Sequence, residues 1–202
     1  MKLYYAPGAC SLAVHITLCE CALPFEMEKV DLKTKKTESG DDFLEINPKG
    51  YVPALIMDDD ALLTEVAVIT QYLADRVPKL SLAPPPGSLE RYRLQEWLNF
   101  ISSEIHKGMG IFFNQNIPAE FKKVLFDKLM LRLNYLEKRI ETNLYLMGDT
   151  YTIADAYLFT ILRWSRLLNI DISSWGGLVQ YYERIGSRPN VQAALRAEHL
   201  IK

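Results

Sequence analysis

The chain has 202 residues, of which 49% are hydrophobic and 24% are charged, and its formal net charge is −2 at neutral pH. This composition is typical of a globular protein long enough for one domain or two small ones. A charge balance so near neutrality excludes the strong basic field of proteins that bind nucleic acid or anionic membranes.

No segment is typical of a targeting signal or of a membrane span. The N-terminus carries one lysine and lacks the apolar core of a secretory signal. No apolar run approaches the roughly 20 residues that a membrane span needs. We therefore expect a cytoplasmic protein without a membrane partner.

The cysteines and histidines predict neither a disulfide framework nor a metal site. No two of the three cysteines, Cys10, Cys19 and Cys21, form a CxxC motif, and a reducing cytosol would keep them as free thiols. Cys19 and Cys21 point to different faces of the expected helix, so we expect both to be packing residues. The three histidines lack a cysteine or histidine neighbour at ligand spacing, and no metal is expected.

The beginning of the chain alternates strand and helix signals. KLYY at 2–5 reads as a strand, and a helix follows whose apolar face is formed by Leu12, Ile16, Cys19 and Leu23. PFEMEKVDL at 24–32 alternates apolar and polar residues and is the second expected strand. KKTESGDD at 35–42 is polar and rich in turn formers, so we expect a loop or an irregular helix there.

A hairpin and another helix complete the first 80 residues. Two antiparallel strands are indicated by VPALIM at 52–57 and ALL at 61–63, which the turn DDD connects. Thr64 is then expected to cap a helix with a buried stripe formed by Val66, Ile69, Leu73 and Val77. The order βαβ(α)ββα predicts one mixed sheet flanked by helices in a domain spanning 1–80.

The second domain, expected over 87–202, contains only helical signals. A linker rich in proline, VPKLSLAPPPGS, precedes it. Apolar residues then recur at the spacing expected of a helical bundle, in the sets Leu94, Leu98, Ile101, Ile105 and Leu125, Leu129, Leu133, Leu136, Ile140. Thr152 and Asp155 form the capping box of a helix that is apolar nearly all round, so we interpret Asp155 as structural.

Cys10 is the first candidate for chemistry, because Pro7 and Gly8 end the strand and place the thiol where a helix begins. Unpaired backbone N–H groups and the positive end of the helix dipole favour the reactive thiolate there. Ser11 adds a hydroxyl that can donate to a nearby sulfur. Position alone leaves both a packing role and a functional role open for Cys10.

Two further segments carry groups that suit a peptide-like ligand. In NPKGYVPALI a trans bond is expected before Pro53, whereas a cis bond would leave the backbone of Val52 able to pair with a ligand. In LLTEVAVI, Glu65 lies in the first turn of a helix. Its carboxylate either stabilises that helix or awaits a substrate ammonium, with the amide of residue 66 free to meet a carboxylate.

A polar stripe runs along the helix expected in EWLNFISSEIHKG. Asn99, Ser103 and His106 recur at positions i, i+4 and i+7, beside the apolar stripe. Solvated faces usually carry lysine and glutamate, whereas amide, hydroxyl and imidazole groups orient and donate. A solvated face and a functional face both remain open for this stripe.

Five segments, in their order and spacing, together resemble a bacterial glutathione transferase of the beta class: PGACS, NPKGYVPAL, LLTE…QYLAD, EWLNFI…EIHKG and TIADAYLFT. The resemblance covers essentially the whole chain. It implies an α+β protein with a thioredoxin-like N-terminal domain, an all-helical C-terminal domain, and a homodimer with glutathione bound between them. It further implies conjugation of glutathione, the co-substrate, to hydrophobic electrophiles in detoxification, without a metal.

The resemblance also assigns catalytic roles. Cys10 would face the glutathione sulfur, with which it can form a mixed disulfide. His106 would be the second catalytic residue, contributed by the helical domain. Tyr5 and Ser11 match positions beside the ligand and rank below these two.

The same resemblance implies contacts along the tripeptide. Lys35 would pair with the glycyl carboxylate. The backbone of Val52, which precedes a proline that is cis in this family, would pair with the cysteinyl moiety. Glu65 and residue 66 would hold the γ-glutamyl group. The family commonly has Ser or Gly where this chain has Val66, and a lost hydrogen bond there would cost about 1.5–3 kcal/mol. Three residues would complete the site near the dimer face: Asn99, Ser103 and Glu104.

Two other functions remain open. One is a glutathione-dependent thiol–disulfide oxidoreductase or peroxidase, in which a second glutathione resolves the mixed disulfide on Cys10. The other is a non-catalytic protein that sequesters apolar ligands, which Val66 keeps open. The sequence does not identify the electrophile, although Phe112, Phe113 and Trp164 are candidates to line its pocket.

Overall fold

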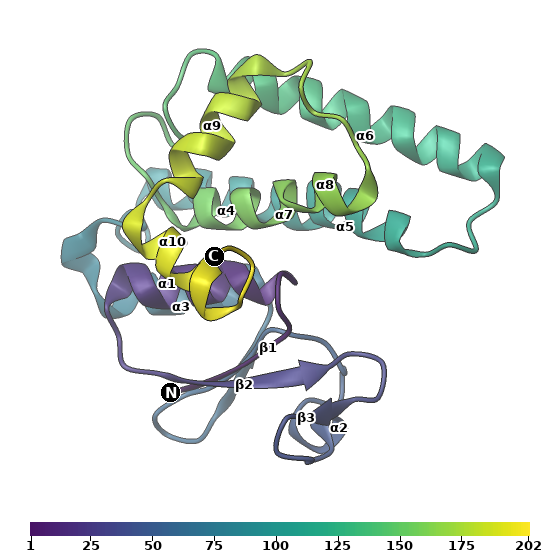
Figure 1. Cartoon of the computed structure of the whole chain (residues 1–202). Helices are drawn as coiled ribbons and strands as arrows, with labels where there is room; N and C mark the ends of the chain where they lie inside the picture. The colour runs from purple at the N-terminus through teal and green to yellow at the C-terminus, as the bar shows by residue number, and fades with distance from the viewer. The chain divides into compact units, whose positions relative to one another are not determined.

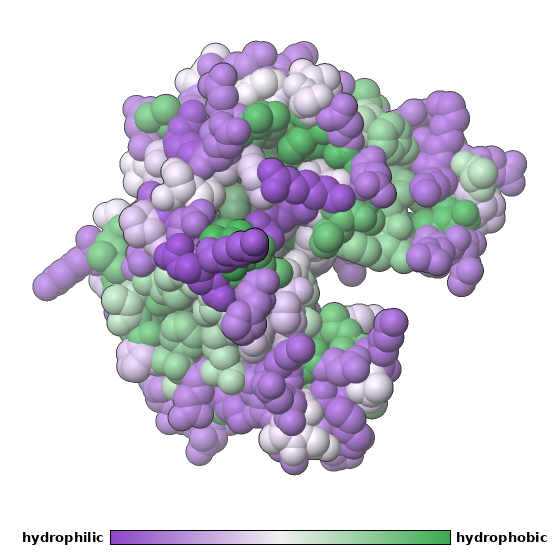
Figure 2. Space-filling view, viewed as in Figure 1, coloured by the Kyte–Doolittle hydropathy of each residue, from purple (hydrophilic) through white to green (hydrophobic).

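The structure is a computed structural model that describes residues 1–202. The chain divides into two compact units, the first formed by Met1–Ser81 with Arg188–Lys202 and the second by Leu82–Ser187. The first contains a sheet and helices, and the second only helices (Figure 1). Hydrophilic residues cover most of the visible surface, with smaller hydrophobic groups between them (Figure 2). No helix combines the length and apolar character needed to cross a membrane.

A five-stranded mixed sheet with the order β3-β2-β1-β4-β5 forms the first unit, as predicted in outline. Its strands are β1 Lys2–Tyr5, β2 Glu26–Asp31, β3 Lys36–Thr37, β4 Ala54–Ile56 and β5 Leu62–Thr64. β1 and β2 run parallel because helix α1 (Ser11–Cys21) connects them, and the other neighbouring strands are antiparallel. The two expected strands and the expected hairpin are confirmed.

The segment 35–42 adds an edge strand where a loop or an irregular helix was expected. β3 pairs with β2, placing Thr37 opposite Val30. Asp42 then caps the short helix α2 (Phe43–Ile46), its carboxylate accepting the N–H of Leu44 at 3.0 Å. A two-residue strand is too short to show an alternation of polar and apolar residues, so the sequence pattern could not reveal it.

Helix α1 is buried on nearly all sides, whereas one apolar face was expected. Every residue from Ser11 to Leu18 is buried, while Cys19 is partly exposed. The cause is that α3 (Val66–Arg76) and α10 (Pro189–Ala197) both pack against it, as Figure 1 shows. Burial raises the pKa of the Cys19 thiol to about 11 and that of the Cys21 thiol to about 12, so both stay neutral, as packing residues would.

The C-terminal segment 188–202 groups with the first unit, whereas the sequence predicts it as part of the helical domain of 87–202. Its helix α10 lies along α1. At one end Arg188 donates from Nε to a carboxylate oxygen of Glu20 at 2.7 Å. Helical periodicity shows that such a segment has an apolar face, but it does not show which of the two units that face packs against.

The start of α3 also differs from expectation. Thr64 is the last residue of β5 and does not cap the helix, because Glu65 occupies the N-cap position with a φ of 73°. A non-glycine residue in this left-handed region is uncommon and is held there by its surroundings. The expected buried stripe is present apart from Val77, which is half-buried at the end of the helix.

The second unit is the predicted helical bundle. Its elements are α4 (Leu89–Phe100), the π-helical turn η2 (Ile101–His106), α5 (Lys107–Gly110), the 3₁₀ turn η3 (Ile111–Phe113), α6 (Ala119–Ile140), α7 (Ile153–Leu162), α8 (Trp164–Leu168) and α9 (Gly176–Gly186). A 3₁₀ turn, η1 (Pro78–Leu80), precedes it in the first unit. The two predicted apolar sets are buried except for Leu125, which is partly exposed.

Asp155 lies in the interior of the second unit, at the start of α7. Its carboxylate accepts the N–H groups of Thr152 at 2.7 Å and Leu146 at 2.9 Å, and the hydroxyl of Tyr181 at 2.8 Å. Complete burial raises the pKa of Asp155, and these donors oppose the rise. The predicted capping box with Thr152 is confirmed, and Asp155 has the structural position expected of it.

Candidate functional site

Cys10 lies at the N-cap position of α1, directly after the turn that ends β1. The turn is closed by a hydrogen bond from the N–H of Ala9 to the carbonyl of Ala6 at 3.0 Å, and Gly8 within it has a φ of 70°. The partly exposed thiol of Cys10 donates to the carbonyl of Val52 at 3.2 Å. The fold therefore brings together two residues that the sequence placed on separate motifs.

Ser11 forms its hydrogen bonds with the backbone of the turn and not with a sulfur. Its side chain is fully buried, and its hydroxyl accepts from the N–H of Ala6 at 3.2 Å and donates to the carbonyl of Ala6 at 3.3 Å. The expectation that this hydroxyl serves a nearby sulfur is therefore wrong. The hydroxyl stabilises the turn, and its direction depends on the path of the chain around Ala6, which sequence adjacency does not reveal.

Tyr5, the other residue ranked below Cys10, is partly exposed at the end of β1. Burial raises the pKa of its hydroxyl, and the charges of Glu198 and Glu38 add to the rise. Tyr5 is therefore a neutral hydroxyl at physiological pH. It can donate a hydrogen bond but carries no charge.

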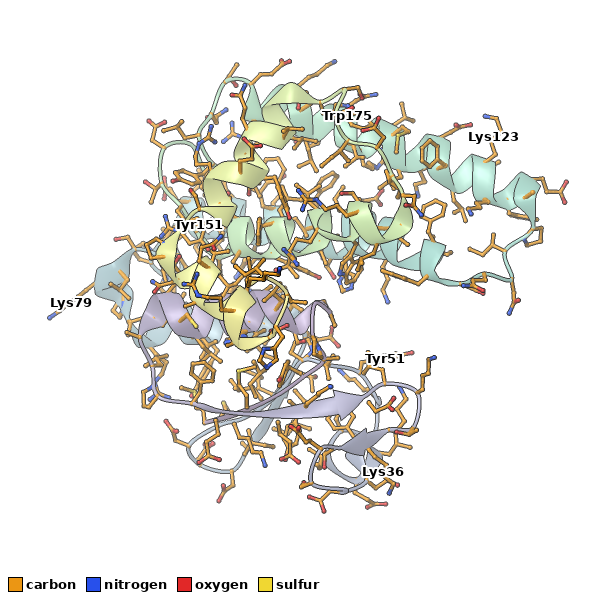
Figure 3. All side chains as sticks on the ribbon, viewed as in Figure 1. Lys36, Tyr51, Lys79, Lys123, Tyr151 and Trp175 are labelled. Carbon is orange, nitrogen blue, oxygen red and sulfur yellow. The ribbon has the colours of Figure 1, made fainter.

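The loop before β4 carries the next two predicted residues. The Val52–Pro53 peptide bond is cis, as the family resemblance implies and contrary to the expectation from the residues alone. The ammonium of Lys35 donates to the carbonyl of Gly50 at 2.8 Å and lies 5.7 Å from the ring centroid of Tyr51, an exposed residue labelled in Figure 3. Lys35 thus brings a positive charge to the same loop that Cys10 contacts through Val52.

Glu65 is exposed and pairs with a residue that was not predicted. Its Oε1 accepts from Nζ of Lys49 at 2.9 Å, and the same ammonium donates to the hydroxyl of Thr64 at 3.0 Å. The signal was present in the sequence, since Lys49 is the lysine of NPKG. An exposed pair of this kind is weak, so an incoming ammonium can replace Lys49. The side chain of Val66 is buried beside it.

The predicted polar residues of the helical unit lie on or next to the π-helical turn η2. Asn99 and Ser103 are exposed, and the hydroxyl of Ser103 donates to the carbonyl of Asn99 at 3.0 Å. A π-helix has more residues per turn than an α-helix, so positions i, i+4 and i+7 do not remain on one line. The side chain of His106 consequently contacts different residues from those that Asn99 and Ser103 contact. π-helical turns of this kind are frequent at functional sites.

His106 sits among aromatic side chains. Its Nδ1 lies 2.7 Å from the hydroxyl of Tyr157, and its ring meets the ring of Trp164 edge-on with centroids 5.0 Å apart. Trp164 in turn contacts Phe113 at 5.3 Å, while Phe112 faces Phe126 instead. Two of the three predicted aromatic residues therefore lie with His106, and Phe112 does not.

Tyr157 is a functional candidate that the sequence pattern did not predict. It lies on α7, whose apolar composition makes it look like any other core residue, and it is 2% exposed. The available signal was its hydroxyl, because a buried tyrosine usually finds a hydrogen-bond partner. That partner is His106, whose ring orientation Tyr157 fixes.

Glu104 and Ser103 line a pocket of about 200 Å³ on the helical unit. The carboxylate of Glu104 accepts from Nε of Arg132 at 2.6 Å, and Lys128 lies 4.0 Å away. This hydrogen bond from Arg132 lowers the pKa of Glu104, which is therefore ionised at neutral pH. The pocket also includes Lys107, so cationic groups surround the one carboxylate.

Comparison with known proteins identifies the family. Residues 8–76 match the model described as glutathione S-transferase, N-terminal domain, and residues 100–189 match the C-terminal domain of the same family. Glutathione S-transferase GstA of Escherichia coli O157:H7 is 46% identical over 200 residues, covering 99% of this chain and 100% of GstA.

Two solved structures extend the likeness over the whole chain. A sphingomonad glutathione S-transferase complexed with glutathione is 43% identical, with a TM-score of 0.95 and 100% of both chains covered. A bacterial beta-class glutathione S-transferase of Sphingomonas chungbukensis is 44% identical, with a TM-score of 0.96 and the same coverage. These findings confirm the beta-class resemblance and the thioredoxin-like α+β fold. The chain belongs to the glutathione S-transferase family.

Proposed function

We propose that this protein is a cytoplasmic glutathione transferase that conjugates the glutathione thiol to hydrophobic electrophiles, a detoxification reaction. One observation carries the proposal: the thiol of Cys10 lies at the start of α1 and 3.2 Å from the carbonyl of Val52. A thiol group bound at this helix N-terminus is favoured in its thiolate form. Free cysteines throughout the chain suit a reducing compartment.

The reaction balances without a metal or an oxidant. The thiol of glutathione loses its proton to solvent, and the thiolate forms a carbon–sulfur bond with the electrophilic carbon. The leaving group departs with the electron pair of the broken bond. The protein contributes a site that lowers the free energy of the thiolate.

Groups of the first unit match the chemistry of the tripeptide. The ammonium of Lys35 suits the glycyl carboxylate, and the backbone of Val52 suits the cysteinyl moiety. The carboxylate of Glu65 suits the γ-glutamyl ammonium, exchanging Lys49 for it. The N–H of Val66, the first residue of α3, is among those that a helix leaves without an internal partner, so it suits the γ-glutamyl carboxylate.

The helical unit supplies the second group of residues. His106, oriented by Tyr157, is the second catalytic residue of the proposal. Its aromatic neighbours Trp164 and Phe113 offer an apolar surface to a hydrophobic electrophile. Three exposed or half-buried residues complete the glutathione site: Asn99, Ser103 and Glu104.

Thiol–disulfide exchange is a second candidate activity, favoured by the half-exposed position of Cys10 itself. The Cys10 thiolate would attack the disulfide of a glutathione mixed disulfide and release the other thiol. A second glutathione would then attack the disulfide formed on Cys10 and regenerate the free cysteine, producing oxidised glutathione. Both steps conserve the number of disulfides and need no further oxidant.

Replacing Cys10 with alanine separates the two activities. With saturating glutathione, we expect the unaltered protein to convert an aryl chloride to its thioether above the uncatalysed rate. The Cys10→Ala variant is expected to lose disulfide exchange completely and to conjugate about tenfold more slowly, which is the effect of one lost hydrogen bond to a thiolate. The measurements are the release of chloride and the formation of oxidised glutathione.

Cys19→Ala is the control, because it removes a thiol whose pKa of about 11 keeps it neutral. We expect both activities to be unchanged in this variant. Absence of any conjugate with the unaltered protein, at every glutathione concentration tried, would refute the proposed transferase activity.

A homodimer is part of the proposal and is supported by the neighbouring helices α4 and α6. Trp97 of α4 stacks on Tyr135 of α6 with ring centroids 5.9 Å apart, and Phe100 meets the same tyrosine at 5.4 Å. A groove of about 510 Å³ runs along these rings and includes Arg93 and Glu96. Exposed aromatic patches with an arginine are typical of protein interfaces.

The pattern along α6 favours a second copy of the chain as the occupant. Its four most exposed apolar residues, Phe121, Val124, Leu131 and Tyr135, recur at the spacing of a helix-packing seam. Arg93 and Glu96 form an ion pair on the same face. A two-fold axis that passes between these two residues would set each charge beside its opposite in the partner, since an isologous interface brings identical surfaces together.

Leu131→Glu is expected to dissociate the dimer, because it buries a charge in the seam. We expect the dissociation constant to rise about 100-fold or more, as for the loss of a central apolar anchor, measured by sedimentation velocity over a range of concentrations. Leu167→Glu is the matched control, since Leu167 on α8 is 67% exposed and Leu131 is 63% exposed. A monomeric parent protein, or equal dissociation of both variants, would contradict this assignment.

A further inference from the structure

A buried carboxylate near the C-terminus contacts the turn that carries Cys10. Glu198, just after α10, has a fully buried side chain. Its Oε2 accepts the N–H of Gly8 at 2.8 Å, and its Oε1 lies 2.9 Å from Nδ1 of His15 on α1. All of these groups belong to the first unit. The carboxylate thus joins three segments: the turn after β1, the body of α1 and the end of α10.

The neighbours of Gly8 show how closely this segment covers the turn. A Cβ atom added to Gly8 would lie 3.4 Å from Cδ2 of Leu200, which follows Glu198 by two residues. Leu200 is itself fixed by a hydrogen bond from its N–H to the carbonyl of Leu195 at 2.9 Å. At the other end of α1, Arg188 and Asn190 both donate to the carboxylate of Glu20. The segment 188–202 is therefore attached at both ends of α1.

Packing alone does not explain a buried Glu–His pair. Removing both groups from water is costly, and apolar residues of similar volume often stabilise a fold as well or better. What an apolar side chain cannot provide is an acceptor for the N–H of Gly8. The carboxylate of Glu198 provides that acceptor, and His15 fixes the direction in which the carboxylate points.

We propose that Glu198 is a positioning residue for Cys10, acting through the N–H of Gly8 and held in place by His15. Gly8 precedes Cys10 by two residues, and Ala9 between them is tied back to Ala6. Fixing Gly8 therefore fixes the direction in which the Cys10 thiol leaves the turn toward the carbonyl of Val52. The inference rests on the proposed role of Cys10 and adds the C-terminal segment to the machinery of that site.

The reactivity of the Cys10 thiol tests this role. Iodoacetamide alkylates thiolates, and digestion followed by mass spectrometry gives the rate at Cys10 separately from Cys19 and Cys21. We expect Glu198→Ala to slow alkylation of Cys10 about tenfold, because a turn that is no longer fixed lets the sulfur move away from the N-terminus of α1, which favours its thiolate. Glu198→Gln, which keeps an acceptor for Gly8 and gains a donor for His15, is expected to restore the rate to within about threefold. Equal slowing by both variants, or no slowing by either, would overturn the proposal.

Glu20→Ala is the matched control, because it releases the opposite end of the same segment from α1. It is expected to lower the melting temperature without changing alkylation at Cys10. Slowing equal to that of Glu198→Ala would mean that any loosening of the segment suffices, and would refute a specific role for Glu198.

Two features keep the test decisive. If Glu198→Ala does not fold, Glu198→Asp keeps the charge but withdraws the acceptor from Gly8, so slower alkylation is still expected and an unchanged rate overturns the proposal. Alkylation also needs neither glutathione nor an electrophilic substrate of the enzyme. A failed conjugation assay would therefore remove the proposed transferase activity and leave the positioning result standing.

Discussion

Asp155→Ala is expected to lower the free energy of unfolding by about 3–6 kcal/mol, because several buried donors lose their acceptor at about 1–3 kcal/mol each. These donors are the N–H groups of Thr152 and Leu146 and the hydroxyl of Tyr181. Domains are typically stable by only about 5–15 kcal/mol, so the variant is expected to be close to unfolding at 25 °C. Urea denaturation followed by circular dichroism measures the change.

The matched control is Asp127→Ala on α6, in the same unit. Asp127 is exposed, and its ion pair with Lys123 lies one helical turn away on the surface. Such pairs contribute little, so we expect the urea midpoint to stay at the parent value. If Asp155→Ala were no less stable than Asp127→Ala, the structural role of the buried carboxylate would be wrong.

Glu65→Gln is expected to raise the KM for glutathione about 10- to 100-fold. The substitution keeps the size of the side chain but removes the charge proposed to bind the γ-glutamyl ammonium, and a hydrogen bond between charged groups contributes about 1.5–3 kcal/mol. We expect kcat to change little, since the γ-glutamyl ammonium that Glu65 is proposed to bind takes no part in the reaction at the sulfur. Steady-state kinetics with glutathione varied at saturating aryl chloride measure both constants.

Glu45→Gln on α2 removes the same charge from an exposed position in the same unit and is the control. Its KM is expected to match that of the parent protein. An equal rise in both variants would trace the effect to net charge rather than to a contact with glutathione. An unchanged KM in Glu65→Gln would remove Glu65 from the site.

The elements that could be predicted are those whose signal is local. KLYY is a short run of strand-forming residues, PFEMEKVDL alternates as a strand does, and the apolar residues from Leu94 onward recur at helical spacing. β1, β2 and α4 therefore follow from the sequence. β3 has only two residues and offers no period to detect. The cap of α3 was misplaced because the backbone at Glu65 enters the left-handed region, which residue type rarely indicates.

The candidate site shows the same division between local and distant signals. The places of Cys10 at a strand-to-helix corner and of Glu65 at a helix start could be predicted, and their roles in binding glutathione stay predictions. The direction of the Ser11 hydroxyl and the partner of His106 depend on residues brought near by the fold, so neither could be predicted. The π-helical turn changes which side chains share a face of the helix, and the residue types in the segment do not indicate that turn.

The first unit is discontinuous along the chain, and this has a consequence during protein synthesis. The ribosome makes Met1–Ser81 first and the helical unit next, and only then Arg188–Lys202. Until that last piece emerges, α1 lacks the helix that covers one of its sides, and the nascent chain exposes apolar surface to chaperones. Any chimaera that exchanges the thioredoxin-like half with a relative must therefore transfer both pieces together.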